Sequence, residues 1–144
     1  MTIEEAEHML ATKLYQNTAK VHFNQHIERE GRFGKRIVYG GHVISLARAL
    51  SFNGLANSLS IAAIHGGRHT APSFAGDTIY AWSEVLARDA LPGRSDIGAL
   101  RIRTVATKDR ACADFPGHDP AADPAATLNV VLDLDYTVLM PRRS

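Results

Sequence analysis

The sequence predicts an α+β domain in which an antiparallel sheet wraps around one long buried helix. Three observations support this fold: an apolar helical pattern over residues 42–56, four strand-like segments after it, and no repeat or linker that would divide the 144 residues. With 45% apolar and 22% charged residues, a chain of this length can bury a core of its own. We therefore expect residues 1–144 to form a single domain.

A first helix is expected near the start of the chain, ending at about Gln16. Thr2 and Glu5 have the spacing of a capping box. The apolar residues that follow keep helical spacing: Ile3, Ala6, Met9, Leu10 and Leu14. The alternative is a strand over the opening residues. Residues 17–39 lose the helical period, which is typical of a surface segment that carries function.

The long helix is expected over residues 42–56, directly after Gly40 and Gly41. Its apolar surface is much wider than a narrow stripe, which indicates a buried helix. The residues that form it are Val43, Ile44, Leu46, Ala47, Ala49, Leu50 and Phe52. Asn53 and Gly54 predict its end, because both residue types readily adopt the left-handed conformation at a helix terminus.

Four strands are expected after the helix, over residues 59–65, 77–87, 99–107 and 127–140. The last strand has the clearest alternation, with Asp133, Asp135 and Thr137 on one face. The opposite, helix-facing side carries Leu128, Val130, Leu132, Leu134, Tyr136, Val138 and Met140. Pro- and Gly-containing turns separate the strands, and residues 110–126 read as an exposed loop. Because the sheet has free edges, we expect it to pair with a second such unit.

Composition excludes several classes of function. A net charge of +1 provides no basic field for nucleic acid, and no segment has the length and apolarity of a membrane span. The first residues lack the order of a signal peptide, so we expect a cytoplasmic protein. Cys112 is the single cysteine and has no assignable His partner, which argues against a disulfide or a catalytic thiol.

Two stretches, residues 17–22 and 33–40, resemble the hydratase motif of the MaoC-like (R)-specific enoyl-CoA hydratases. Residues 71–77 are similar to the Pro-x-x-x-Gly-Asp turn of that family. More narrowly, residues 17–26, 39–42 and 139–142 resemble the C-terminal half of the mesaconyl-CoA hydratases, also called β-methylmalyl-CoA dehydratases. The resemblance spans about residues 10–141 and implies the hot-dog fold. Since those enzymes contain two hot-dog halves, either truncation or a homodimer would account for a single one.

The resemblance implies catalysis by His22 and Asn17. This chain departs from the family pattern at three places. It has Asn17 where the family has Asp, Ala19-Lys20 where the family has Asn-Pro, and Tyr39 where the family has His. Asn17 can hold a water molecule but cannot remove its proton, so His22 would act as both acid and base. The alternative is that His22 only satisfies a hydrogen bond in the loop.

The substrate site is expected around the start of the long helix. The backbone N–H groups of Gly40 and Gly41 would stabilise negative charge on the thioester carbonyl, although the pair could also be only a tight turn. Tyr39 and His42 flank the pair and complete this part of the site. Three basic residues in the preceding segment could bind the CoA phosphates or a free substrate carboxylate, or could simply solubilise the loop: Arg32, Lys35 and Arg36.

We therefore expect a hydro-lyase that adds or removes water across the double bond of a short branched acyl-CoA such as mesaconyl-CoA, with no cofactor. No metal site is expected, because the pair His22 and His26 lacks the Glu of a zinc motif. The pair His65 and His69 would be about 13 Å apart along one strand. Two alternatives remain: a non-catalytic acyl-CoA-binding half, and a thioesterase, although residues 42–59 hold no carboxylate for the latter.

Overall fold

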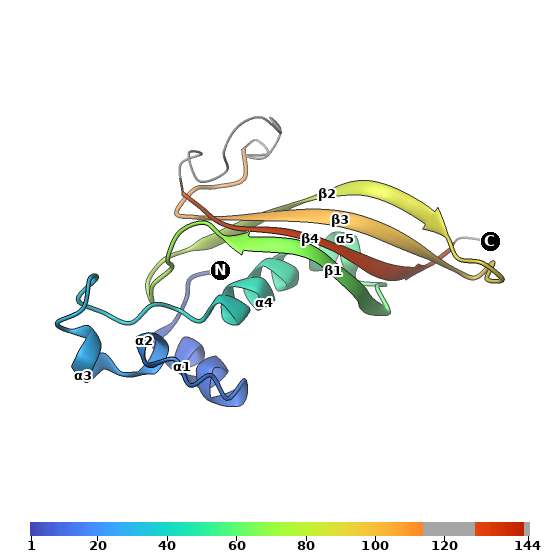
Figure 1. Ribbon diagram of the computed structural model, residues 1–144. Coiled ribbons are helices and arrows are strands. Elements are labelled where there is room, and N and C mark those ends of the chain that lie inside the picture. The colour runs from blue at the N-terminus through green and yellow to red at the C-terminus, as the bar shows by residue number, and fades with distance from the viewer. Residues whose placement is uncertain (114–128, 143–144) are drawn as a thin grey trace.

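The computed structural model describes residues 1–113 and 129–142, which form one antiparallel sheet with a helix along its face (Figure 1). The sheet has the order β1-β4-β3-β2, so β1 and β2 are its edge strands. This confirms the predicted α+β arrangement. The helices are α1 (Glu5–Leu14), α2 (Lys20–Phe23), α3 (Gln25–Glu28), α4 (Gly40–Leu50) and α5 (Phe52–Leu55). The strands are β1 (Ser60–His69), β2 (Ile79–Ala90), β3 (Ile97–Lys108) and β4 (Val130–Pro141).

The core lies between α4 and the concave face of the sheet. Helix α4 packs against β2 and β3, and α1 packs against α4 from the other side. Each fully buried Val, Leu or Ile contributes about 1.5–3 kcal/mol to folding. The buried apolar residues of this core include Val43, Leu46, Ala47, Ile79, Ile102, Val105, Leu132, Tyr136 and Val138.

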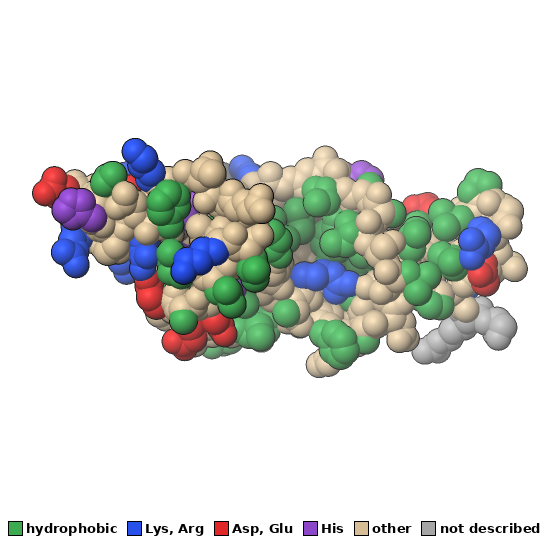
Figure 2. Space-filling view, turned by 90° about the horizontal axis from the view of Figure 1, so that it is seen from below, with side chains coloured by type: hydrophobic (Ala, Val, Ile, Leu, Met, Phe, Trp, Pro, Cys, Tyr) green, Lys and Arg blue, Asp and Glu red, His purple; other side chains and the backbone are tan. Residues whose placement is uncertain are grey.

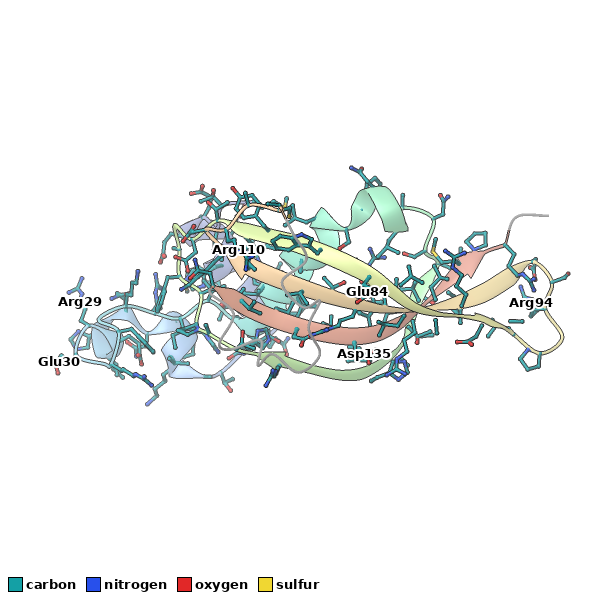
Figure 3. All side chains as sticks on the ribbon, turned by 90° about the horizontal axis from the view of Figure 1, so that it is seen from above. Arg29, Glu30, Glu84, Arg94, Arg110 and Asp135 are labelled. Carbon is teal, nitrogen blue, oxygen red and sulfur yellow. The ribbon has the colours of Figure 1, made fainter. Side chains whose placement is uncertain are left out.

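Strand β4 alternates as predicted between a buried and an outward-facing side. On the outer face, which Figure 3 shows from above, Asp135 pairs with Arg101 at 2.6 Å and Asp133 pairs with Arg103 at 2.9 Å. These cross-strand ion pairs engage both outward-facing aspartates of β4. The predicted inward position of Leu128 and most of the predicted loop over residues 110–126 lie outside the described residues.

The predicted capping box at the start of α1 is wrong. The N-cap position is Glu4, and no side chain caps the helix. The Thr2 hydroxyl instead hydrogen-bonds to the Thr78 hydroxyl at 2.9 Å. The amide of Ile3 donates to the Asp77 carbonyl at 3.0 Å, so residues 1–3 extend beside the start of β2. The alternative of an extended start therefore holds for these residues, because pairing with the sheet satisfies their backbone groups.

Helix α4 also ends earlier than predicted. Its last residue is Leu50, and the Ser51 hydroxyl and amide both donate to the Ala47 carbonyl, at 2.9 and 3.2 Å. These bonds satisfy a carbonyl of the last turn, so the chain turns at Ser51. Asn53 and Gly54 lie in the short α5, and neither has positive φ.

Strand β1 is exposed along its whole length and has an unpaired edge. Figure 2 shows the helix-bearing side of the molecule, where hydrophobic side chains gather around a hollow. Large apolar residues exposed on or beside β1, α4 and α5 are Leu50, Phe52, Leu59, Ile61 and Ile64. Within the described residues, no helix is long and apolar enough to span a membrane.

Candidate functional site

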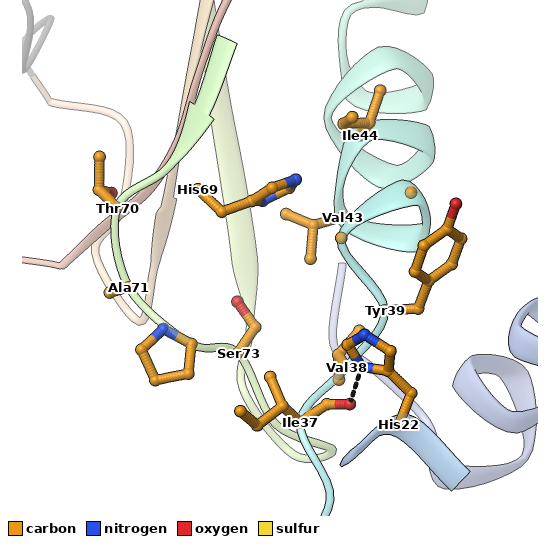
Figure 4. Close-up of a pocket in the computed structure, with 13 residues that line it drawn as sticks. His22, Ile37, Val38, Tyr39, Val43, Ile44, His69, Thr70, Ala71 and Ser73 are labelled. Atoms are coloured by element: carbon orange, nitrogen blue, oxygen red, sulfur yellow. Dashed lines mark hydrogen bonds between the residues drawn. The ribbon is translucent and has the colours of Figure 1, made fainter. Parts of the chain in front are cut away.

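A pocket of about 600 Å³ opens where three segments converge: α2, the start of α4, and the segment after β1 (Figure 4). Its walls are largely apolar, and none of the residues that line it is Lys, Arg, Asp or Glu. The polar side chains come from five residues: His22, Tyr39, His69, Thr70 and Ser73. The rest of the lining consists of Ile37, Val38, Gly40, Gly41, Val43, Ile44, Ala71 and Pro72.

His22 is held in one orientation by a backbone carbonyl. Its Nδ1 lies 2.9 Å from the carbonyl oxygen of Ile37, and the Ile37 amide donates back to the Val21 carbonyl at 3.0 Å. A carbonyl oxygen only accepts, so Nδ1 must carry the proton and Nε2 of the neutral ring keeps its lone pair. The Tyr39 ring packs edge-on against the imidazole, with 5.7 Å between centroids. His22 therefore presents a fixed base to the pocket.

The first turn of α4 supplies two free donors to the same pocket. Tyr39 is the N-cap residue and makes no side-chain cap. The amides of Gly40 and Gly41 donate to no backbone carbonyl in the described chain, because the first bond of the turn runs from the His42 amide to the Tyr39 carbonyl at 2.9 Å. Unpaired amides at a helix start favour a partial negative charge.

Two aromatic rings of the chain crowd Gly40 and Gly41. A Cβ on Gly40 would lie 2.5 Å from Nε2 of His69, and one on Gly41 would lie 2.5 Å from Cε1 of Tyr39. Rings of this chain occupy the space that a side chain at either position would need. Glycine is thus needed for the packing of the pocket itself.

Besides Thr70, His69 and Ser73 are the polar pocket residues that the sequence analysis did not assign to the site. Figure 4 shows both side chains pointing into the space between the segment after β1 and α4. Ser73 is 3% exposed and its hydroxyl has no partner. Burial lowers the pKa of His69, and a hydrogen bond with the Val131 backbone partly opposes this shift. The family-like turn over residues 71–77 could have pointed to both residues, because it contains Ser73 and directly follows the strand that ends at His69.

Asn17 does not line the His22 pocket. Its side-chain oxygen accepts the Ala19 amide at 2.9 Å, which closes the turn before α2. The residue borders a separate hollow beside α1, together with Met9 and Phe23. Because its acceptor is engaged and its position lies outside the pocket, the expected role of Asn17 in holding water beside His22 is not supported by this arrangement.

His42 also lies outside the pocket. It is 9% exposed, its Nε2 has no partner, and the α1 residue Glu7 acts on it electrostatically. Burial lowers the pKa of His42, an effect that the charge of Glu7 partly opposes. Its position on the side of α4 that faces α1 explains why it is buried away from the expected substrate.

The three basic residues of the loop have partners outside the pocket. Arg36 forms an ion pair with Glu5 and donates to Met9 Sδ at 2.9 Å, so it ties the loop to α1 rather than facing a substrate. Arg32 and Lys35 are exposed and lie over aromatic rings, at 5.0 Å from the Phe33 centroid and 4.3 Å from the Phe74 centroid respectively. Both remain accessible to a phosphate.

His65 and His69, the two histidines of β1, have different surroundings. His65 Nε2 lies 2.7 Å from the Thr137 hydroxyl on the neighbouring strand, while His69 lines the pocket. Within residues 1–113 and 129–142, no group of three or more His, Cys, Asp or Glu side chains is arranged to hold a metal. Cys112 is exposed, with its Sγ 3.6 Å from the Ala81 carbonyl.

No family model matches the chain. Two curated proteins are similar to it over 99% of its length. The β-methylmalyl-CoA dehydratase of Chloroflexus aurantiacus is 77% identical, and the mesaconyl-CoA hydratase of Cereibacter sphaeroides is 54% identical. The chain spans 40% of the first protein and 39% of the second, about two fifths of each.

Solved structures of similar fold include proteins of the same kind. A structure from Chloroflexus aurantiacus, described as a MaoC-domain dehydratase, matches with a TM-score of 0.89 and 75% identity, covering 100% of this chain and 40% of that one. A Mycobacterium tuberculosis protein described as having a double hot-dog fold matches with a TM-score of 0.66 and 25% identity, over 99% of this chain and 36% of that one. The sheet curled around α4 is thus a hot-dog unit. The chain belongs to the MaoC-like hydratase family, in the branch that contains β-methylmalyl-CoA dehydratase and mesaconyl-CoA hydratase.

Proposed function

We propose that this chain carries the active site of a hydro-lyase that reversibly hydrates a short branched α,β-unsaturated acyl-CoA, with mesaconyl-CoA as the favoured substrate. One observation carries the proposal: His22 is fixed through Nδ1 to the Ile37 carbonyl, so its Nε2 is free in the pocket that also holds the unpaired amides of Gly40 and Gly41. A base and an oxyanion-stabilising group in one apolar pocket suit this reaction.

In the proposed mechanism, Nε2 of His22 removes a proton from water as the water oxygen attacks the β-carbon. Electrons move to the thioester oxygen, where the N–H groups of Gly40 and Gly41 stabilise the developing charge. The His22 imidazolium then returns its proton to the α-carbon, so one water molecule has been added in total. A positioned base contributes about 10²–10⁴ in rate, and an oxyanion donor about 10²–10³. No cofactor is required by these steps.

We also propose that the active protein contains a second hot-dog unit, supplied by another copy of this chain in a homodimer or larger homo-oligomer. The exposed edge and apolar side chains of β1 support this, because an unpaired apolar strand favours association. The similar proteins are also about two and a half times as long as this chain, since the chain spans 40% and 39% of them. A cytoplasmic location fits a CoA thioester substrate.

Two measurements on the purified protein test the proposal: loss of the enoyl thioester absorbance of mesaconyl-CoA, and the mass in solution by sedimentation. We expect turnover by a species larger than a monomer. Binding of acyl-CoA without turnover would instead support a non-catalytic acyl-CoA-binding half, an alternative favoured by the position of Asn17 outside the pocket. Release of free CoA would indicate a thioesterase.

A further inference from the structure

We propose that Ser73 and His69 form a subsite that binds a free carboxylate on the acyl group. This proposal rests on the proposed hydration function and deepens it, because it assigns the residues that would select a carboxylated acyl group over a plain one. A substrate carboxylate was one of the ligands considered for the loop cations Arg32, Lys35 and Arg36, besides the CoA phosphates, but none of the three lines the pocket.

The Ser73 hydroxyl is a buried donor with nothing to bind. Only 3% of the residue is exposed, and its Oγ has no hydrogen-bond partner. Its backbone is engaged, because the Ser73 carbonyl accepts the Val38 amide at 2.8 Å, so the residue is held in place beside the pocket. A buried unpaired hydroxyl is costly and is commonly explained by a ligand or ordered water. Figure 4 shows this hydroxyl pointing into the pocket, toward His69.

The His69 imidazole is the second polar group at this end of the pocket. Its ring is positioned by close packing, since Nε2 lies where only a glycine at position 40 leaves room. Apart from His22, it is the side chain among the residues lining the pocket that can become a cation near neutral pH. A carboxylate arriving beside it would favour the protonated ring, which then donates a charge-assisted hydrogen bond.

Two of the other polar residues of the pocket, His22 and Thr70, are already engaged. The Tyr39 ring packs against His22, on the other side of the α4 start from His69 and Ser73 (Figure 4). Nδ1 of His22 is bound to Ile37, and its Nε2 is needed for the water. The Thr70 hydroxyl donates to the Val130 carbonyl at 2.6 Å. In mesaconyl thioesters the carboxylate is attached to the β-carbon, so a β-carbon held beside His22 places this group inside the pocket. Ser73 and His69, which lie on the side of the pocket away from Tyr39 (Figure 4), are the polar side chains that we assign to receive it.

The test compares kcat/KM for two substrates, mesaconyl-CoA and crotonyl-CoA, which lacks the carboxylate. In S73A we expect kcat/KM for mesaconyl-CoA to fall about 10- to 100-fold more than that for crotonyl-CoA, the usual effect of removing a hydrogen bond to a charged group. H69Q keeps a donor but cannot become a cation, and should shift the ratio in the same direction. The matched control is T70V, which removes a hydroxyl that is already bonded and should lower both values equally.

The outcomes separate this proposal from the hydration function. If the wild type turns over both substrates and neither S73A nor H69Q changes their ratio, the subsite is wrong while the hydration function stands. If the wild type turns over neither substrate, the hydration function fails. Calorimetric binding of methylsuccinyl-CoA against butyryl-CoA then decides the subsite, which requires a preference for the carboxylated thioester that S73A removes. Because the Ser73 hydroxyl makes no bond, S73A should keep the wild-type melting temperature, which verifies that the comparison is made on folded protein.

Discussion

The imidazole of His69 packs directly on the backbone of Gly40, with Nε2 only 2.5 Å from the place where a Cβ would stand. This contact joins the end of β1 to the start of α4 across the pocket. The His69 ring can lie in this place because residue 40 is a glycine, although the two residues are far apart in the sequence.

The first prediction follows from this contact. G40A should displace His69 and destabilise the fold by about 1–3 kcal/mol, the usual cost of overpacking a closely packed site. Urea unfolding measures the stability, and the mesaconyl-CoA to crotonyl-CoA ratio measures the pocket. G54A is the control, because a Cβ there meets nothing within 4 Å and Ala is favoured over Gly in a helix. Equal stability of the two variants would contradict the packing role of Gly40.

The second prediction concerns His22. H22A should lower kcat by about 10²–10⁴, since it removes the proposed proton-transfer group. N17A is the comparison, and it should have a much smaller effect on kcat because Asn17 lies outside the pocket and holds a turn. Hydration measured at saturating substrate checks both variants. Undiminished activity in H22A would rule out the mechanism, while a large loss of kcat in N17A would restore the water-holding role expected from the sequence.

The third prediction is that the fold weakens in mild acid because of two buried histidines. Burial lowers the pKa of both His8 and His42, and in His8 the nearby imidazoles of His42 and His22 add to the shift. The carboxylates that face them from α1 are Glu5, 3.7 Å from His8 Nε2, and Glu7. The unfolded chain, with His pKa near 6.5, therefore binds protons that the folded chain does not.

This difference in proton binding sets the direction in which stability changes with pH. This contribution to stability is fully present above pH 6.5 and is lost as the pH falls below it toward the lowered pKa values. The free energy of unfolding in urea should thus be smaller at pH 5 than at pH 7.5. H8L should reduce this pH dependence, whereas H26A, on the exposed surface of α3, should leave it unchanged. An identical pH dependence in H8L and the wild type would contradict the assignment.

The long regular elements were predictable because their signals are local, whereas the short helices α2 and α3 lie in a segment that was expected to lack a helical period. The alternation of Asp133 and Asp135 with buried neighbours places β4 correctly, and the wide apolar surface around Leu46 identifies α4. The failures involve partners distant in sequence. Thr2 and Glu5 have the sequence spacing of a capping box, but the Thr2 hydroxyl bonds to the Thr78 hydroxyl instead. In the same way, Ser73 looks like an ordinary turn residue until the fold buries its hydroxyl beside the pocket.

The sequence predicted site residues correctly only where they are adjacent in sequence to the element that positions them. Tyr39, Gly40 and Gly41 belong to the turn that starts α4, so their proximity to the pocket follows from the sequence. Arg36 is close to these residues in sequence, yet tertiary contact with Glu5 and Met9 draws its side chain toward α1. His69 enters the pocket through the pairing of β1 with β4, which no local pattern encodes.

The last prediction tests assembly through β1. This strand is exposed along its length, and Ile61 and Ile64 are 48% and 63% exposed. If a second hot-dog unit covers them, a Lys at either position would be desolvated without a partner, which strongly disfavours association. I64K should therefore sediment as a monomer at micromolar concentration while keeping its fold by circular dichroism. L14K, at an α1 residue that is 71% exposed and away from β1, should retain the wild-type mass. A wild-type protein that is already monomeric would contradict the proposed homo-oligomer, and an unchanged mass in I64K would move the interface away from β1.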